Sequence, residues 1–175
     1  MSNPLSANPA KVNMSASTLP SQYLKFKLYP EVEAMLPVDQ ITEILKLRLV
    51  QIMPIPQMPT WVMGVYNWRG EILWMVDLSQ LLGLDSWYRH QSESSKHTAV
   101  VLSAERQQVR IHLGLIVAQV DDLAYCDPNT IQSAIDNQLD ASWSNFARGY
   151  WLDPSGSMVL ALEGGAIAEA MPTNP

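Results

Sequence analysis

The sequence of 175 residues is poor in the side chains on which catalysis and metal binding most often depend. It has one cysteine, Cys126, and three histidines, His90, His97 and His112. A single cysteine cannot form an internal disulfide, which favours a reducing cytoplasm, and the histidines lack metal-ligand spacing. Motifs for a nucleophilic serine, a phosphate loop or a zinc protease are absent as well. We therefore expect no enzyme, no metal and no cofactor.

Charged residues and long apolar runs are also scarce. Only 16% of the residues are charged, and 11 Lys and Arg stand against 17 Asp and Glu, a net charge of −6. Nucleic-acid binding needs clustered positive charge, so nucleic acid is excluded as a partner. The most apolar long window, 61–84, is interrupted by Arg69, Glu71 and Asp77. It is expected to form core rather than a membrane span, so no direct membrane insertion is expected.

Apolar residues nevertheless make up 47% of the chain, enough for a packed core. Residues 1–20 are rich in Ser, Asn, Pro and Ala, have little to bury, and lack the apolar stretch of a signal peptide. We expect a disordered tail over 1–20, one folded domain over 21–165, and a tail or short helix over 166–175.

Short apolar runs between turn residues predict a mainly β protein. The expected strands are 22–28, 34–38, 47–53, 61–66, 72–76, 98–104, 109–120, 123–126, 146–151 and 157–162. Hairpin turns are expected at 67–70 and 153–156, where glycine can adopt a positive φ. The polar, Ser-rich segment 85–97 is interpreted as a loop between two lobes.

A few helical turns complete the prediction. Val38, Ile41, Ile44 and Leu45 fall at helical spacing, and Asp39 is a candidate N-cap, which together predict a short helix. Asp77 is expected to cap a helical turn over 79–82, and 164–171 is expected to be a short helix. Composition and pattern alone lead no further than a mainly β domain.

An ordered set of short motifs resembles the CheW family, whose pattern runs V/I-x-E-I, P-x-x-P, G-V-x-N-L-R-G-x-I, V-D-L and L-G. The matching segments are ITEI (41–44), MPIP (53–56), GVYNWRGEIL (64–73), VDL (76–78) and LGL (82–84). The later segments LGLIVAQV (113–120), RGY (148–150) and VLALE (159–163) are also similar to that family. The resemblance spans about residues 22–163.

The resemblance implies a mainly β fold of two SH3-like, five-stranded β-barrel lobes that share a hydrophobic core, with short helices. It implies a non-enzymatic adaptor between methyl-accepting chemoreceptors and a CheA-type histidine kinase, in chemotaxis, phototaxis or type IV pilus motility. Such an adaptor is cytoplasmic and is recruited to receptor arrays. Two alternatives stay open: a protein-binding module of this fold with a non-chemotactic partner, and a small-molecule sensor or enzyme that uses a cleft between the lobes.

The resemblance also implies a receptor-binding face. Its residues are Val38, Ile41, Glu43, Gly64, Asn67, Trp68, Arg69 and Gly70. Within this face we predict an ion pair between Glu43 and Arg69, whereas the alternative pairs Glu43 with Lys46. Val38 and Ile41 divide between core and groove.

Two tryptophans depart from the family pattern. Trp68 replaces the usual leucine, and Trp74 stands where proline is common. The side chain of Trp68 either is exposed at the hairpin tip or folds back onto its lobe. Both tryptophans bear on the choice of partner.

Overall fold

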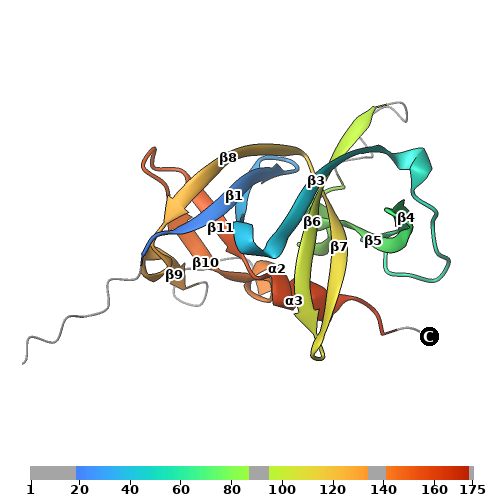
Figure 1. The fold of residues 1–175 in the computed structure, drawn as a ribbon. Coiled ribbons are helices and arrows are strands. Elements are labelled where there is room, and N and C mark those ends of the chain that lie inside the picture. The colour runs from blue at the N-terminus through green and yellow to red at the C-terminus, as the bar shows by residue number, and fades with distance from the viewer. Residues whose placement is uncertain (1–18, 87–94, 134–140, 174–175) are drawn as a thin grey trace, which may run out of the picture.

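Two curled β-sheets pack against each other in the computed structural model, which describes residues 19–86, 95–133 and 141–173 (Figure 1). The tail expected over 1–20 lies outside these residues except for its last two. Residues 87–94 of the expected loop also lie outside them.

The first sheet has six strands in the order β8-β1-β2-β11-β10-β9. Its strands are β1 (Ser21–Leu28), β2 (Val32–Pro37), β8 (Gln119–Cys126), β9 (Gln132–Ser133), β10 (Ala147–Leu152) and β11 (Met158–Leu162). Neighbouring strands are antiparallel except for the parallel pair β11 and β2. The two residues of β9 give this sheet one strand more than expected.

The second sheet has five strands in the order β3-β6-β7-β5-β4. Its strands are β3 (Ile41–Arg48), β4 (Val62–Trp68), β5 (Glu71–Asp77), β6 (Lys96–Arg106) and β7 (Val109–Val117). The pair β5 and β7 is parallel and the others are antiparallel. The strands β3 and β4 are therefore the two edges of this sheet. The two sheets confirm the expected mainly β fold of two lobes.

Short helices lie between the strands and after the last one. They are η1 (Val38–Gln40), η2 (Leu49–Gln51), α1 (Leu78–Leu81), η4 (Pro128–Thr130), α2 (Ala141–Ser144) and α3 (Gly164–Ala170). As predicted, Asp77 caps α1, because its Oδ1 accepts a hydrogen bond from the backbone N–H of Gln80 at 3.1 Å. The helix α3 follows β11 but packs on β6, so it ties one sheet to the other.

One hydrophobic cluster joins the two sheets. Phe26 and Leu28 of β1 belong to the same buried cluster as Leu102 of β6 and Leu115 of β7. The shared core predicted for the two lobes is therefore confirmed. A second buried cluster lies within the five-stranded lobe and includes Trp68.

The helix predicted around residues 38–46 is wrong. Only Val38–Gln40 form a helical turn, and Ile41–Arg48 are the strand β3. Along β3 the less exposed side chains alternate with the exposed ones, from Ile41 to Leu47. This is the period of two of a strand. The strand predicted over 47–53 is also wrong, since β3 ends at Arg48 and the turn η2 follows.

The interpretation of 85–97 as a loop between two lobes is wrong as well. The strands before and after it, β5 and β6, belong to the same five-stranded sheet. The chain instead changes sheets between β2 and β3, and again between β7 and β8. The five-stranded lobe is therefore one continuous stretch of chain, whereas the six-stranded lobe is assembled from the parts before and after it.

No helix within the described ranges is both long and apolar enough to cross a membrane.

Candidate functional site

Side-chain contacts of Glu43 join the two edge strands of the five-stranded sheet. Glu43 lies on the edge strand β3, whereas Trp68 ends the other edge strand, β4. The indole N–H of Trp68 donates to Glu43 Oε1, and Arg69 Nη2 lies 2.5 Å from Glu43 Oε2. The predicted ion pair of Glu43 with Arg69 is therefore present, although Glu43 lies on a strand rather than a helix. The alternative partner Lys46 instead donates to Thr98.

The hairpin between β4 and β5 presents Arg69 to solvent. The Arg69 backbone has a φ of 55°, in the left-handed region, and the Asn67 side chain accepts a hydrogen bond from Gly70 N at 3.0 Å. The guanidinium carbon of Arg69 lies 5.5 Å from the centre of the Trp68 ring, within cation–π range. The Arg69 side chain is 69% exposed and that of Glu43 is 24% exposed.

Trp68 folds back onto its lobe. Only 8% of its surface is exposed, and its ring lies 5.1 Å from that of His112 on β7. Of the two positions left open by the sequence, the structure thus adopts the buried one. Trp68 therefore supports the surface from below rather than forming it.

Gly64 allows two backbone segments of this lobe to lie in contact. It has a φ of 133°, and a Cβ atom built on it would lie 2.1 Å from the carbonyl oxygen of Met53. The connector that contains Met53 is held there by hydrogen bonds between the backbones of Met53 and Val65. The close approach of the Met53 backbone therefore explains why the predicted site residue at position 64 is a glycine.

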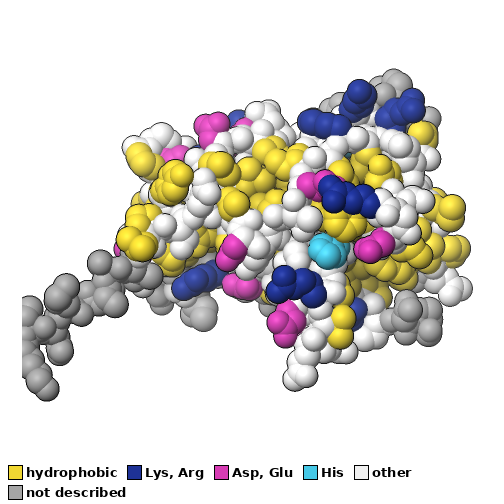
Figure 2. Space-filling view, in the orientation of Figure 1, with side chains coloured by type: hydrophobic (Ala, Val, Ile, Leu, Met, Phe, Trp, Pro, Cys, Tyr) yellow, Lys and Arg dark blue, Asp and Glu magenta, His cyan; other side chains and the backbone are white. Residues whose placement is uncertain are grey.

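An apolar groove of about 250 Å³ begins beside Glu43 and lies between the two sheets. Its lining residues are Leu24, Val38, Ile41, Glu43, Ile44 and Leu123. Ile44 and Leu123 are 45% and 52% exposed, so the groove presents two large apolar side chains to solvent. Figure 2 shows hydrophobic side chains gathered between β8 and β3, with acidic and basic side chains beside them.

Apart from Gly64, the predicted site residues fall into two adjoining groups. Val38 and Ile41 line the groove and also pack against the shared core, whereas Asn67, Trp68, Arg69 and Gly70 form the hairpin end. Glu43 belongs to both groups. Sequence reasoning missed Leu24, Ile44 and Leu123, because only the folded chain brings β1, β3 and β8 together.

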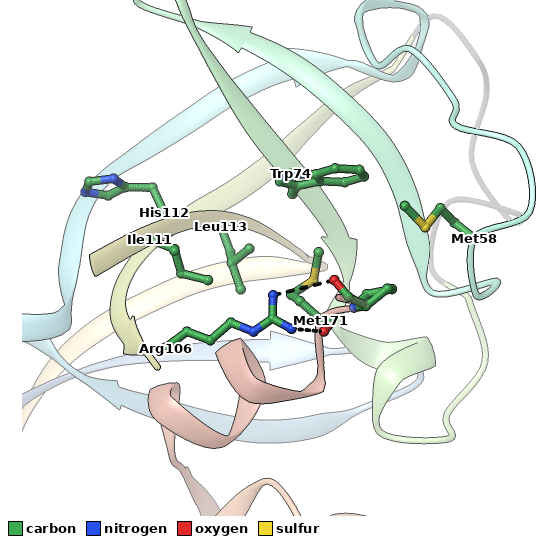
Figure 3. Close-up of a pocket in the computed structure, with 8 residues that line it drawn as sticks. Met58, Trp74, Arg106, Ile111, His112, Leu113 and Met171 are labelled. Atoms are coloured by element: carbon green, nitrogen blue, oxygen red, sulfur yellow. Dashed lines mark hydrogen bonds between the residues drawn. The ribbon is translucent and has the colours of Figure 1, made fainter. Parts of the chain in front are cut away.

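A second hollow, of about 280 Å³, lies beside the C-terminal end of α3 (Figure 3). Trp74 and Arg106 face each other across it, and His112 lies on the side away from Met58. Arg106 Nη2 donates to the Met171 carbonyl at 2.7 Å. This hydrogen bond satisfies a carbonyl at the end of α3 and fastens the helix to β6.

The described residues contain no cluster of His, Cys, Asp and Glu that could hold a metal ion. Burial raises the pKa of the Cys126 thiol, which makes it a poor nucleophile. Exposed apolar area beside a fixed ion pair is instead suited to binding another protein.

Three comparisons with known proteins show to which family the chain belongs. The sequence model of the CheW-like domain matches residues 22–171. The chain is 33% identical over 114 residues to the chemotaxis protein CheW of Rhizobium meliloti (strain 1021), an alignment that covers 65% of this chain and 62% of that protein. Its fold is similar to the crystal structure of the scaffolding protein TtCheW from Thermoanaerobacter tengcongensis, with a TM-score of 0.66 at 22% identity. That likeness covers 83% of this chain and 90% of the other. Because the match to the family spans most of the folded residues, the chain belongs to the CheW-like domain family.

Proposed function

We propose that this protein is a non-enzymatic adaptor that couples a methyl-accepting chemoreceptor to a CheA-type histidine kinase. The observation that carries the proposal is the apolar groove bordered by the ion pair of Glu43 with Arg69. The names of the similar proteins, a chemotaxis protein and a scaffolding protein, support the same role. The adaptor works in the cytoplasm at membrane-bound receptor arrays, and its pathway controls motility.

The receptor side of this proposal is the groove. A receptor tip made of helices presents apolar side chains at i, i+3 and i+4 spacing, and such a helix face can fill an apolar groove. Ile44 and Leu123 are the exposed apolar side chains that this contact would bury. Arg69 would then lie at one end of the bound helix.

An adaptor needs a second face for its kinase. Val50, Met53 and Ile72 are among the most exposed large apolar side chains, and they belong to the five-stranded lobe but do not line the groove. We assign the kinase contact to these exposed side chains. Two separate faces would allow both partners to bind at once, as a coupling protein requires.

Affinity capture from native cells tests the adaptor proposal. Tagged wild-type protein should recover both the receptor and the kinase. Ile44→Glu, which places a charge in the groove, should lose the receptor and keep the kinase, whereas Ile72→Glu should do the reverse. Thr42→Glu, an exposed substitution on the same strand β3, is the matched control and should keep both partners.

Two results would contradict the proposal. If a folded wild-type protein recovers neither partner, the chain has kept the fold with a non-chemotactic partner, the alternative that the sequence left open. If Ile44→Glu and Ile72→Glu each lose both partners while their melting temperatures stay at the wild-type value, the two faces are not separate.

A further inference from the structure

Both oxygens of the Glu43 carboxylate already accept hydrogen bonds within the protein. Oε1 accepts from the Trp68 indole and Oε2 from Arg69. With its side chain only 24% exposed, Glu43 is turned toward its own lobe. The charged group that faces outward at this end of the groove is therefore Arg69.

Arg69 has donors to spare. A guanidinium carries five N–H groups, and Nη2 is the one bound to Glu43 in the described structure. The Arg69 side chain as a whole is 69% exposed, and its partner Glu43 lines the groove. A carboxylate is the group that such a fork binds best, because it can accept two parallel hydrogen bonds.

Trp68 connects the interior of the five-stranded lobe to the ion pair of Glu43 with Arg69. Its ring is buried against His112, and its single donor reaches Glu43. A buried ring with few rotamers holds the carboxylate in one place, and the carboxylate in turn holds Arg69. A side chain of similar burial without a donor, such as leucine or phenylalanine, could not do this.

We infer that Trp68 is a positioning residue that fixes Glu43, so that Arg69 is presented to a carboxylate of the bound receptor segment. This inference rests on the proposed function and adds the chemistry of the partner: a helical segment with apolar anchors and an Asp or Glu at the end that meets Arg69. Because the guanidinium is fixed in advance, little conformational freedom is lost when the carboxylate binds.

The positioning step is tested first, without any partner. NMR of protein labelled with ¹⁵N-tryptophan resolves the indole N–H of Trp68, which Trp68→Phe identifies by its disappearance. We expect hydrogen exchange of this N–H to speed up by about tenfold or more in Glu43→Ala, since the hydrogen bond is lost. In Arg69→Ala the exchange rate should stay at the wild-type value. If Glu43→Ala leaves the rate unchanged, Trp68 does not hold Glu43 and the inference is wrong.

The partner step uses the purified cytoplasmic signalling domain of a methyl-accepting receptor from the same organism. Trp68→Phe keeps Arg69 and an aromatic ring, yet it should weaken binding by about tenfold, because the carboxylate below Arg69 is no longer fixed. Trp151→Phe, the same change in β10 of the other sheet, should bind as the wild type does. Arg69→Glu should abolish binding, whereas Arg110→Glu, the same change at an exposed arginine, should not.

A charge exchange identifies the partner's carboxylate. Asp and Glu residues of the receptor tip are changed to Lys one at a time and tested against Arg69→Glu. One of them should restore binding. Two outcomes, each together with binding by the wild type, would overturn the inference and leave the adaptor proposal intact. In the first, no change in the receptor restores binding to Arg69→Glu. In the second, Trp68→Phe binds as tightly as the wild type does. Absence of wild-type binding to every receptor of the organism contradicts the adaptor proposal itself, and the NMR result still decides whether Trp68 positions Glu43.

Discussion

A single glycine allows two stretches of backbone to pass in contact in the five-stranded lobe. At Gly64 a Cβ atom would collide with the Met53 carbonyl, and the φ of 133° is one that other residues rarely adopt. At Gly70 the φ is 87°, but a Cβ atom would meet nothing within 4 Å. The two glycines of one hairpin thus differ in what they permit.

This difference predicts unequal effects of the same substitution. Gly64→Ala should lower the free energy of unfolding by about 3 kcal/mol or more, because it adds a backbone collision to the conformational strain. Gly70→Ala should cost about 1–2 kcal/mol, since only the strain of the positive φ applies. Urea denaturation of both variants measures the difference. Equal losses would mean that the connector at Met53 moves aside.

The burial of His97 predicts that the folded protein is less stable in mild acid. The side chain is buried, neither ring nitrogen has a hydrogen-bond partner among the described residues, and burial lowers the pKa of His97 below 6.5. The unfolded chain therefore takes up the proton at a higher pH than the folded one does. The stability contributed by the neutral imidazole is complete above pH 6.5 and is lost as the pH falls below it.

Urea denaturation at pH 7.5 and pH 5.5 measures this loss. In His97→Leu the decrease between the two pH values should be smaller than in the wild type. A decrease of the same size in both proteins would show that other groups cause it.

At the scale of elements, β3 shows where a sequence pattern misleads. The less exposed positions of β3 are Ile41, Glu43, Leu45 and Leu47. A carboxylate among them interrupts the apolar alternation, so the helical spacing of Val38, Ile41, Ile44 and Leu45 gave the wrong prediction. Trp68 and Arg69, which make Glu43 tolerable there, are 25 and 26 residues away.

The hairpins were predictable because their signals are local. The turns at 67–70 and 153–156 lie between adjacent strands, and each is held by an Asn or Asp side chain within it. The ion pair of Glu43 with Arg69 was predicted from the family resemblance, not from spacing. The groove could not be predicted, because β1, β3 and β8 supply its walls from distant parts of the sequence.

The contacts of Glu43 with Trp68 and Arg69 predict that Glu43 contributes more to stability than Arg69 does. Glu43→Ala leaves the nearly buried indole N–H of Trp68 without its acceptor, which should cost about 1–3 kcal/mol. Arg69→Ala removes an exposed partner and should cost about 1 kcal/mol or less. Urea denaturation of the two variants provides the comparison, and a larger loss in Arg69→Ala would contradict it.

At the scale of the whole molecule, the strands of each sheet come from both halves of the chain. The strands β6 and β7 lie between β3 and β5 in one sheet, and β1 lies between β8 and β2 in the other. A break between β5 and β6 would therefore divide both sheets. Neither half of the chain retains an intact lobe.

We therefore expect fragments 1–86 and 95–175 to be unfolded when separate and to fold when mixed. Circular dichroism and NMR of each fragment and of the equimolar mixture measure this. A fragment that folds alone would show that one lobe needs only half of the chain. The intact protein is the reference for the spectrum of the mixture.

The two crossings of the chain between sheets have a mechanical consequence. The first runs through Val38–Gln40, and the second through Ala118, whose N–H donates to the Lys27 carbonyl at 2.9 Å. Val38 is itself a wall of the groove. A tensile load that pulls the lobes apart across the groove would be carried by covalent backbone at these crossings, besides the packed side chains. The molecule should therefore resist separation of its lobes, which keeps the two walls of the groove together while a partner pulls on it.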